Sequence, residues 1–282
     1  MALESVDALF LAHDDAAVWE LFHENSKTSR YERHLTYAIH PSDETIVRAM
    51  ARLRRVKPYA DMPKVALPRD FPRTSTNLDE ALRRRTTARR FGGGSIELAE
   101  LAKVMHASYG VTRDNVDTIF PRPFRTIPSG GALYPLELYV EALDVEGLER
   151  GLYHYDPEDH SLDLLRLEED AAPPSRLFVQ GELCLTAAAV IFVSAIFYRS
   201  TFKYGDRGYR FVLLEAGHLA QNAALTAVDL GLAFVEVGGY FDRDVDRYLG
   251  FDGLSESTVY VLLVGQPEEA ASPDDAVAGN GR

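Results

Sequence analysis

The sequence of 282 residues contains one cysteine, one tryptophan and no apolar run of membrane-spanning length. A lone cysteine excludes a disulfide bond within the chain, and the apolar neighbours of Cys184 are typical of a buried structural thiol. Acidic Glu4 and Asp7 stand where an export signal would carry basic residues. We therefore expect a cytoplasmic protein that does not contact a membrane.

Basic residues are also scarce, because 30 lysines and arginines face 43 acidic residues and leave a net charge of −13. Such a surface repels phosphate backbones, which excludes a general nucleic-acid binder. The eight histidines never pair with cysteine or acidic residues at metal-ligand spacing, so no metal site is predicted. The hydrophobic content of 46% is enough for the core of one large domain, with or without an extension.

Helical periodicity and proline content divide the chain into three parts. Residues 1–75 predict a helical N-terminal extension that ends in a proline-rich strap, where the prolines should prevent regular structure. Residues 76–266 predict the main domain, and residues 267–282 predict a disordered acidic tail.

Helices and strands follow one another in the main domain. An almost wholly apolar helix between two apolar strands predicts a crossover unit, and its narrow polar stripe predicts a helix buried in the core or against a second subunit. Ser95 is the predicted cap of another helix. The predicted helices are 78–85, 95–108 and 207–232, and the predicted strands are 136–143, 153–155, 162–165, 188–197, 233–237 and 259–264.

Two glycine-rich segments can expose their backbone to a ligand. In Pro128–Pro135, Ser129, Gly130 and Gly131 form a turn whose N–H groups have no bulky side chain above them, so a flat polar ligand can approach closely. Gly238 and Gly239 end the strand 233–237 and offer bare backbone in the same way. A plain turn is the alternative at both places.

Five arginines gather between Arg83 and Arg90 in a chain that is otherwise acidic. Their guanidinium groups, with a threonine hydroxyl as a further donor, could hold a dianionic phosphate, and a solvated basic face is the alternative. Gly92–Gly94 lacks both the preceding strand and the following Gly-Lys-Ser/Thr of a nucleotide loop. We interpret it as a flexible joint.

Lys203 and Tyr204 stand between a buried strand and the long helix, in a segment expected to be a loop. Desolvation at such a place can lower the pKa of a lysine, which suits a general base. The alternative is an ordinary exposed pair.

Taken in order, these segments resemble the FMN-dependent nitroreductase superfamily over nearly the whole chain up to residue 266. Within it, the strings Ala132–Glu137, Lys203–Arg210 and Glu215–His218, and the extension Phe22–Lys27, are similar to the SagB-type branch, whose members are azoline dehydrogenases. The superfamily landmarks are Arg85-x-Thr87-x-Arg89-x-Phe91, Pro128–Pro135, and Gly231-Leu232 followed by Gly238-Gly239.

The resemblance implies an α+β fold with a nitroreductase-like mixed sheet flanked by helices, in a domain-entwined homodimer that binds FMN between its subunits. One departure is that Gly265-Gln266-Pro267 provides no basic residue for the phosphate after the last strand. The residues implied are Arg85, Thr87 and Arg89 for the phosphate and ribityl chain, Gly238 and Gly239 for the flavin ring, Pro128, Ser129 and Gly130 for the ring from the other subunit, and Lys203 and Tyr204 as the catalytic pair.

The activity implied is the oxidation of a thiazoline or oxazoline ring to the azole, with FMN as the electron sink, Lys203 or Tyr204 as the base and O₂ as the expected acceptor. The azoline would belong to a peptide or to a carrier-protein-bound intermediate, and a cyclodehydratase is a candidate partner. Two alternatives stay open. One is an NAD(P)H-dependent nitro- or quinone reductase, and the other is a non-catalytic subunit of a peptide-modifying complex.

Overall fold

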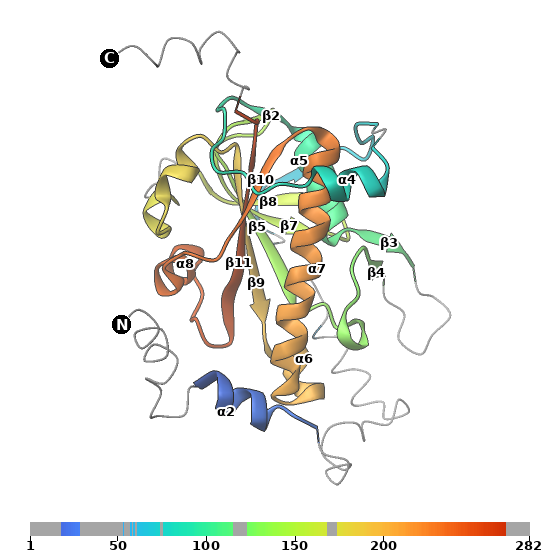
Figure 1. Ribbon diagram of the computed structural model, residues 1–282, viewed down its shortest axis with the longest axis vertical. Coiled ribbons are helices and arrows are strands. Elements are labelled where there is room, and N and C mark those ends of the chain that lie inside the picture. The colour runs from blue at the N-terminus through green and yellow to red at the C-terminus, as the bar shows by residue number, and fades with distance from the viewer. Residues whose placement is uncertain are drawn as a thin grey trace, which may run out of the picture.

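The computed structural model describes residues 18–28, 53, 57, 59, 61–73, 76–114, 123–167 and 174–268. A central sheet is covered on one face by the long helix α7 (Arg207–Leu230), with α6 at one end of that helix and α4 near the other (Figure 1). The predicted helix near residues 45–50 and the tail from residue 269 lie outside the described residues.

The sheet has seven strands in the order β1-β8-β7-β5-β9-β11-β10, and every neighbouring pair in it is antiparallel. Since β9 and β10 both run antiparallel to β11, they are parallel to each other, and α7 connects them as the predicted crossover. The α+β class is confirmed. The strands of the sheet are β1 (Lys64–Ala66), β5 (Leu136–Ala142), β7 (Gly151–Asp156), β8 (Ser161–Leu167), β9 (Ala189–Ile196), β10 (Ala233–Val237) and β11 (Glu256–Gly265).

Two shorter strand pairs lie outside the main sheet. The pair β2 (Ile96–Glu97) and β6 (Val145–Glu146) is parallel, and the pair β3 (Val111–Arg113) and β4 (Phe124–Arg125) is antiparallel. The proline-rich strap was expected to lack regular structure. That expectation is wrong for β1, because β1 pairs with the edge of the sheet at β8 between the prolines that flank it.

The two faces of the sheet bury separate apolar clusters. Even-numbered β5 residues such as Leu138 pack with α5 (Leu98–Tyr109) and α7, whereas Tyr139 packs on the other face with α8 (Asp242–Leu249). The strand β9 is buried on both faces, which explains its unbroken apolar sequence.

The polar stripe of α7 is the surface that faces α5. Glu215 accepts a hydrogen bond from Tyr109, Asn222 donates to the Ala107 carbonyl, and Asp229 pairs with Lys103. The predicted burial of α7 in the core is confirmed for its apolar face, which includes Val212, Leu219 and Ala223. On the opposite side Leu213 and Leu214 are 43% and 61% exposed.

Two local predictions about helices are wrong. The helix α5 begins after Glu97, whose carboxylate forms a capping box with Glu100, whereas the predicted cap Ser95 donates to Glu146 at 2.8 Å. The segment that contains Lys203 was expected to be a loop, but α6 (Tyr198–Tyr204) makes it helical. The remaining described α-helices are α2 (Val18–Asn25) and α4 (Leu78–Arg84), the latter capped by Asn77.

No helix within the described residues is both long and apolar enough to cross a membrane.

Candidate functional site

The arginine cluster follows α4 and is fastened to the edge strand β10. The Ala88 N–H donates to the Phe234 carbonyl at 2.8 Å, and the Arg85 guanidinium lies 3.4 Å from the Thr87 hydroxyl. The exit of α4 therefore places the Arg85–Arg89 segment alongside β10, and thus near the glycine pair that follows it.

The arginines of this cluster differ in their partners. Arg83, Arg84 and Arg90 each pair with a carboxylate. Within the described part of the chain, Arg85 and Arg89 have no carboxylate partner. Two guanidinium groups are thus available to an anion at the positions where the resemblance expects a phosphate.

Thr87 and Arg89 line a cavity of about 420 Å³ together with Gly238 and Gly239. A Cβ built on Gly238 would meet nothing within 4 Å, so the backbone there is open to the cavity. The Val179 N–H donates to the Gly239 carbonyl at 2.9 Å and holds one wall in place. The volume falls within the usual range for small-molecule and cofactor pockets.

The predicted site residues fall into two groups. The first group is the Arg85–Arg89 segment with Gly238 and Gly239, and the second is the turn Pro128–Gly131 with Lys203 and Tyr204. A Cβ built on Gly131 would lie 2.7 Å from Tyr204 Oη and 2.9 Å from Lys203 Nζ. Gly131 also has a φ of 62°, a conformation that favours glycine. The ends of both predicted catalytic side chains therefore lie beside Gly131.

Lys203 and Tyr204 form the last turn of α6 and are both half-buried. Lys203 Nζ lies 5.2 Å from the centroid of the Tyr204 ring, which allows a cation–π contact, and the Phe211 ring meets the Tyr204 ring edge-on at 4.9 Å. The side chains of Lys203, Tyr204 and Phe211 thus occupy the space beside Gly130 and Gly131 that was expected to be open to a ligand.

The structure brings the predicted residues together in two groups but does not join the groups within one chain. The first group lies near the C-terminal end of α7, where Thr86 and Ala88 share a pocket wall with Val228 and Gly231. The second group lies at the N-terminal end of α7, beside α6 (Figure 1). Phe211, which lies against Gly130, and Val228, beside Thr86 and Ala88, are 17 residues apart on α7, about 25 Å along the helix, so the two groups lie well apart within one chain.

A buried polar network beneath the second group was not foreseen from the sequence. Glu215 contacts Ser129 and accepts a hydrogen bond from Tyr109 at 3.2 Å. Burial raises the pKa of Glu215 to about 7, although Ser129 and the Arg125 guanidinium act in the opposite direction. The signal that could have located it is an acidic residue within an almost apolar helix.

A second network anchors α6. Glu137 on β5 binds Arg199 of α6 at 2.5 Å and His154 of β7 at 2.8 Å. Burial opposes ionisation of Glu137, but Arg199 and His154 hold its pKa down at about 2. The helix that carries Lys203 is thus tied to the sheet by a buried ion pair.

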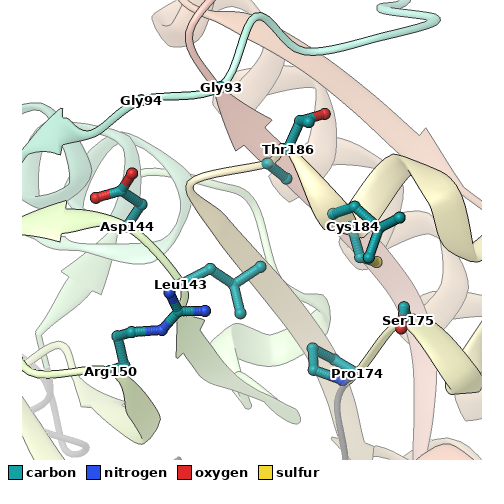
Figure 2. Close-up of a pocket in the computed structure, with 11 residues that line it drawn as sticks. Gly93, Gly94, Leu143, Asp144, Arg150, Pro174, Ser175, Cys184 and Thr186 are labelled. Atoms are coloured by element: carbon teal, nitrogen blue, oxygen red, sulfur yellow. The ribbon is translucent and has the colours of Figure 1, made fainter.

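Figure 2 shows a smaller cavity of about 220 Å³, lined by Gly93, Gly94, Arg150 and Cys184 among others. None of the predicted cofactor or catalytic residues lines it. Cys184 is buried there, and burial raises the pKa of its thiol to about 12. The thiol is therefore protonated at neutral pH, in agreement with its expected structural role.

Within the described residues, no three histidine, cysteine, aspartate or glutamate side chains gather as a metal site would require.

The profile of the nitroreductase family matches residues 82–266, which include both groups. The chain belongs to the nitroreductase family. It is accordingly a nitroreductase-family oxidoreductase, and members of this family typically bind FMN.

Three relatives have names that bear on activity. The nitroreductase-like protein MJ1384 of Methanocaldococcus jannaschii is 39% identical over 68% of this chain and 92% of its own length. The trifolitoxin-processing protein TfxB of Rhizobium leguminosarum bv. trifolii is 31% identical over 51% of this chain, and the microcin B17-processing protein McbC of Escherichia coli is 33% identical over 50%. The matches span only 40% of TfxB and 52% of McbC.

Solved structures agree on the fold. A nitroreductase-like protein from Anabaena variabilis superposes with a TM-score of 0.64 and 24% identity, over 88% of this chain and 47% of that one. A chain of the E. coli microcin synthetase McbBCD complex with truncated pro-MccB17 superposes with a TM-score of 0.53 and 21% identity, over 92% of this chain and 97% of that one.

Proposed function

We propose that this protein is an FMN-dependent azoline dehydrogenase, which oxidises thiazoline or oxazoline rings to thiazoles or oxazoles in a peptide natural product. The observation that carries the proposal is that Lys203 Nζ and Tyr204 Oη converge on the same side of Gly131. A reductase that takes hydride from NAD(P)H needs no such pair, whereas removal of a ring proton needs a base beside the flavin. Relatives named for the processing of microcin B17 and trifolitoxin support the same substrate class.

The residues of the first group fit FMN. Arg85, Arg89 and Thr87 supply donors for the phosphate and ribityl chain, and Gly238 and Gly239 leave room for the ring. No basic residue follows β11, since Gln266 there donates to the Ser95 carbonyl at 2.9 Å. The phosphate would therefore depend on the two arginines.

When bound, FMN would supply the acceptor for two electrons and a proton, a hydride equivalent. The protein's part is to take the remaining proton from the ring carbon next to the carbonyl. Lys203 in its neutral form, or Tyr204 as its phenolate, would accept this proton. Both side chains lie beside Gly131, in the turn where the resemblance places the ring system.

We further propose a homodimer in which the second group of one subunit completes the first group of the other. The two groups lie well apart within one chain, and Leu213 and Leu214 offer an exposed apolar surface on the helix between them. Leu78 and Leu82 on α4, near the other end of α7, are also exposed, at 67% and 53%. A cyclodehydratase that forms the azoline would be the enzyme's functional partner, and the substrate would be bound to a peptide or a carrier protein.

An NAD(P)H-dependent nitro- or quinone reductase is the second candidate, and the identity of 39% to the nitroreductase-like protein MJ1384 favours it. A non-catalytic subunit would keep the fold without the flavin.

One experiment separates the three. Purified protein is incubated with an azoline-containing peptide, or in parallel with a nitroarene and NAD(P)H. The dehydrogenase should be yellow and should remove two hydrogens from the azoline, as measured by mass spectrometry. Steady NAD(P)H oxidation with no azole would identify a reductase, and a colourless protein inactive in both assays would identify a non-catalytic subunit.

A further inference from the structure

The Ser129–Tyr134 turn is held in a strained conformation. Ala132 and Tyr134 both have a φ of 48°, and neither is a glycine. Left-handed conformations at such residues persist only where surrounding contacts enforce them. Lys203 Nζ and Tyr204 Oη lie beside Gly131 in this turn. The contacts that enforce the turn conformation therefore also set the position of the turn backbone relative to these two side chains.

The enforcing contacts come from three elements. Within the turn, the Tyr134 N–H donates to Ser129 Oγ at 2.9 Å, and the Arg125 N–H of β4 donates to Tyr134 Oη at 3.0 Å. From α7, the Glu215 carboxyl group contacts the Ser129 side chain. Ser129 Oγ accepts from the Tyr134 N–H and keeps a second lone pair and its own hydrogen, so it can accept from a neutral carboxyl group or donate to a carboxylate.

Glu215 itself is fixed from a further side. The Tyr109 hydroxyl accepts from the Leu136 N–H at 3.1 Å and donates to Glu215 Oε1 at 3.2 Å, so α5 and the start of β5 set the position of the carboxyl group. Only 2% of Glu215 is exposed. A long side chain that is buried and hydrogen-bonded at Oε1 has little freedom, and its contact with Ser129 restricts the turn as well.

We propose that Glu215 is a positioning residue whose carboxyl group holds the Ser129–Tyr134 turn against Lys203 and Tyr204. The consequence for catalysis rests on the proposed function, whereas the consequence for the turn does not. The charged groups around the carboxyl group are Arg125, whose guanidinium lies 4.1 Å from the Tyr109 ring centroid, and, through Tyr109, Glu137 and Arg199. Burial outweighs the nearby arginine and keeps the acid neutral below about pH 7.

The neutral acid can be imitated by an amide. In Glu215→Gln, the amide oxygen can still accept from Tyr109 and the amide N–H can donate to Ser129 Oγ. Glu215→Leu removes both bonds at similar volume. Glu141→Leu is the matched control, because Glu141 is equally buried and accepts from a tyrosine, Tyr248, on the other face of the sheet.

Hydrogen exchange of the segment 127–134, measured by mass spectrometry on the protein as purified, tests the proposal without reference to activity. We expect exchange at least about tenfold faster in Glu215→Leu, unchanged in Glu215→Gln, and unchanged in Glu141→Leu. Where Glu215→Leu fails to fold, Glu215→Met removes the same contacts with an unbranched side chain and should give the same increase. Unchanged exchange in the folded variants would overturn the proposal.

Turnover of the flavin-loaded protein supplies the second readout. Glu215→Leu should lower kcat by at least about tenfold with little change in KM, and the inflection of kcat near pH 7 in the wild type should be absent in Glu215→Gln. Wild-type kcat in Glu215→Leu would also overturn the proposal. If the wild type forms no azole at all, the proposed function fails, while the exchange data still decide whether Glu215 holds the turn.

Discussion

Arg199 Nη1 lies 2.5 Å from Glu137 Oε1, and this buried ion pair fastens α6 to the centre of the sheet. Arg199 and Lys203 are four residues apart on α6 and therefore project from the same side of the helix. The pair thus fixes the rotation of the short helix that presents Lys203.

Removal of one partner of the Arg199–Glu137 ion pair should lower the stability of the fold. We expect Arg199→Met to lower the free energy of unfolding by about 3–5 kcal/mol, because it leaves Glu137 and its partner His154 without their cation in a dry interior. Urea denaturation measures the change. Arg247→Met, which breaks an exposed pair with Asp244, is the control and should change stability by less than about 1 kcal/mol; a similarly small effect at Arg199 would contradict the role assigned to the pair.

Glu215 gives stability a defined dependence on pH. Its pKa in the folded protein is raised to about 7 from an ordinary 4.5, so the folded state binds its proton more tightly than the unfolded chain. This contribution is fully present below pH 4.5 and is lost as pH rises through 7, a change of about 3 kcal/mol. The difference in unfolding free energy between wild type and Glu215→Gln should therefore fall between pH 5 and pH 8. A constant difference over this range would show that Glu215 titrates normally.

Flavin binding should depend on Arg85 and Arg89, which have no acidic partner among the described residues. We expect Arg85→Ala with Arg89→Ala to release FMN, since each lost charge-assisted contact costs about 1.5–3 kcal/mol. Absorbance after gel filtration measures the bound fraction. The matched double variant Arg83→Ala with Arg90→Ala removes the same charge from residues that pair with Asp79 and Glu268, and it should stay yellow.

Dimerisation should depend on the exposed face of α7. Leu214 is 61% exposed, and a glutamate there would place a charge in the proposed interface. We expect Leu214→Glu to be monomeric and free of FMN by light scattering and absorbance. Leu254→Glu, at a position 84% exposed beyond α8, should remain dimeric. A Leu214→Glu protein that stays dimeric and yellow would place the interface elsewhere.

Long periodic segments made most of the fold predictable. The unbroken apolar run of β9 and the polar stripe of α7 each correspond to one physical cause, burial on both faces of the sheet and contact with α5. The loop expected around Lys203 was wrong, because α6 is held in place by Arg199 and Glu137, which lie 62 residues apart. No local pattern reveals such a contact.

The grouping of the candidate site residues was predictable in part. Glycine turns and a dense arginine cluster are visible in the sequence, and both lie in the two groups that the structure brings together. The pairing of Arg90 with Glu268 was not predictable, and neither was the contact of Ser129 with Glu215, because both depend on side chains that only the fold brings together.

The central claim is that Lys203 and Tyr204 remove the ring proton. Lys203→Ala and Tyr204→Phe should keep FMN and the dimer but lower azoline oxidation by about 10²-fold or more, the usual scale for loss of a general base. The decisive measurement is the rate at which flavin-loaded Lys203→Ala removes two hydrogens from an azoline-containing peptide, followed by mass spectrometry. The account predicts a yellow protein that forms almost no azole; near-wild-type turnover in this variant would contradict it.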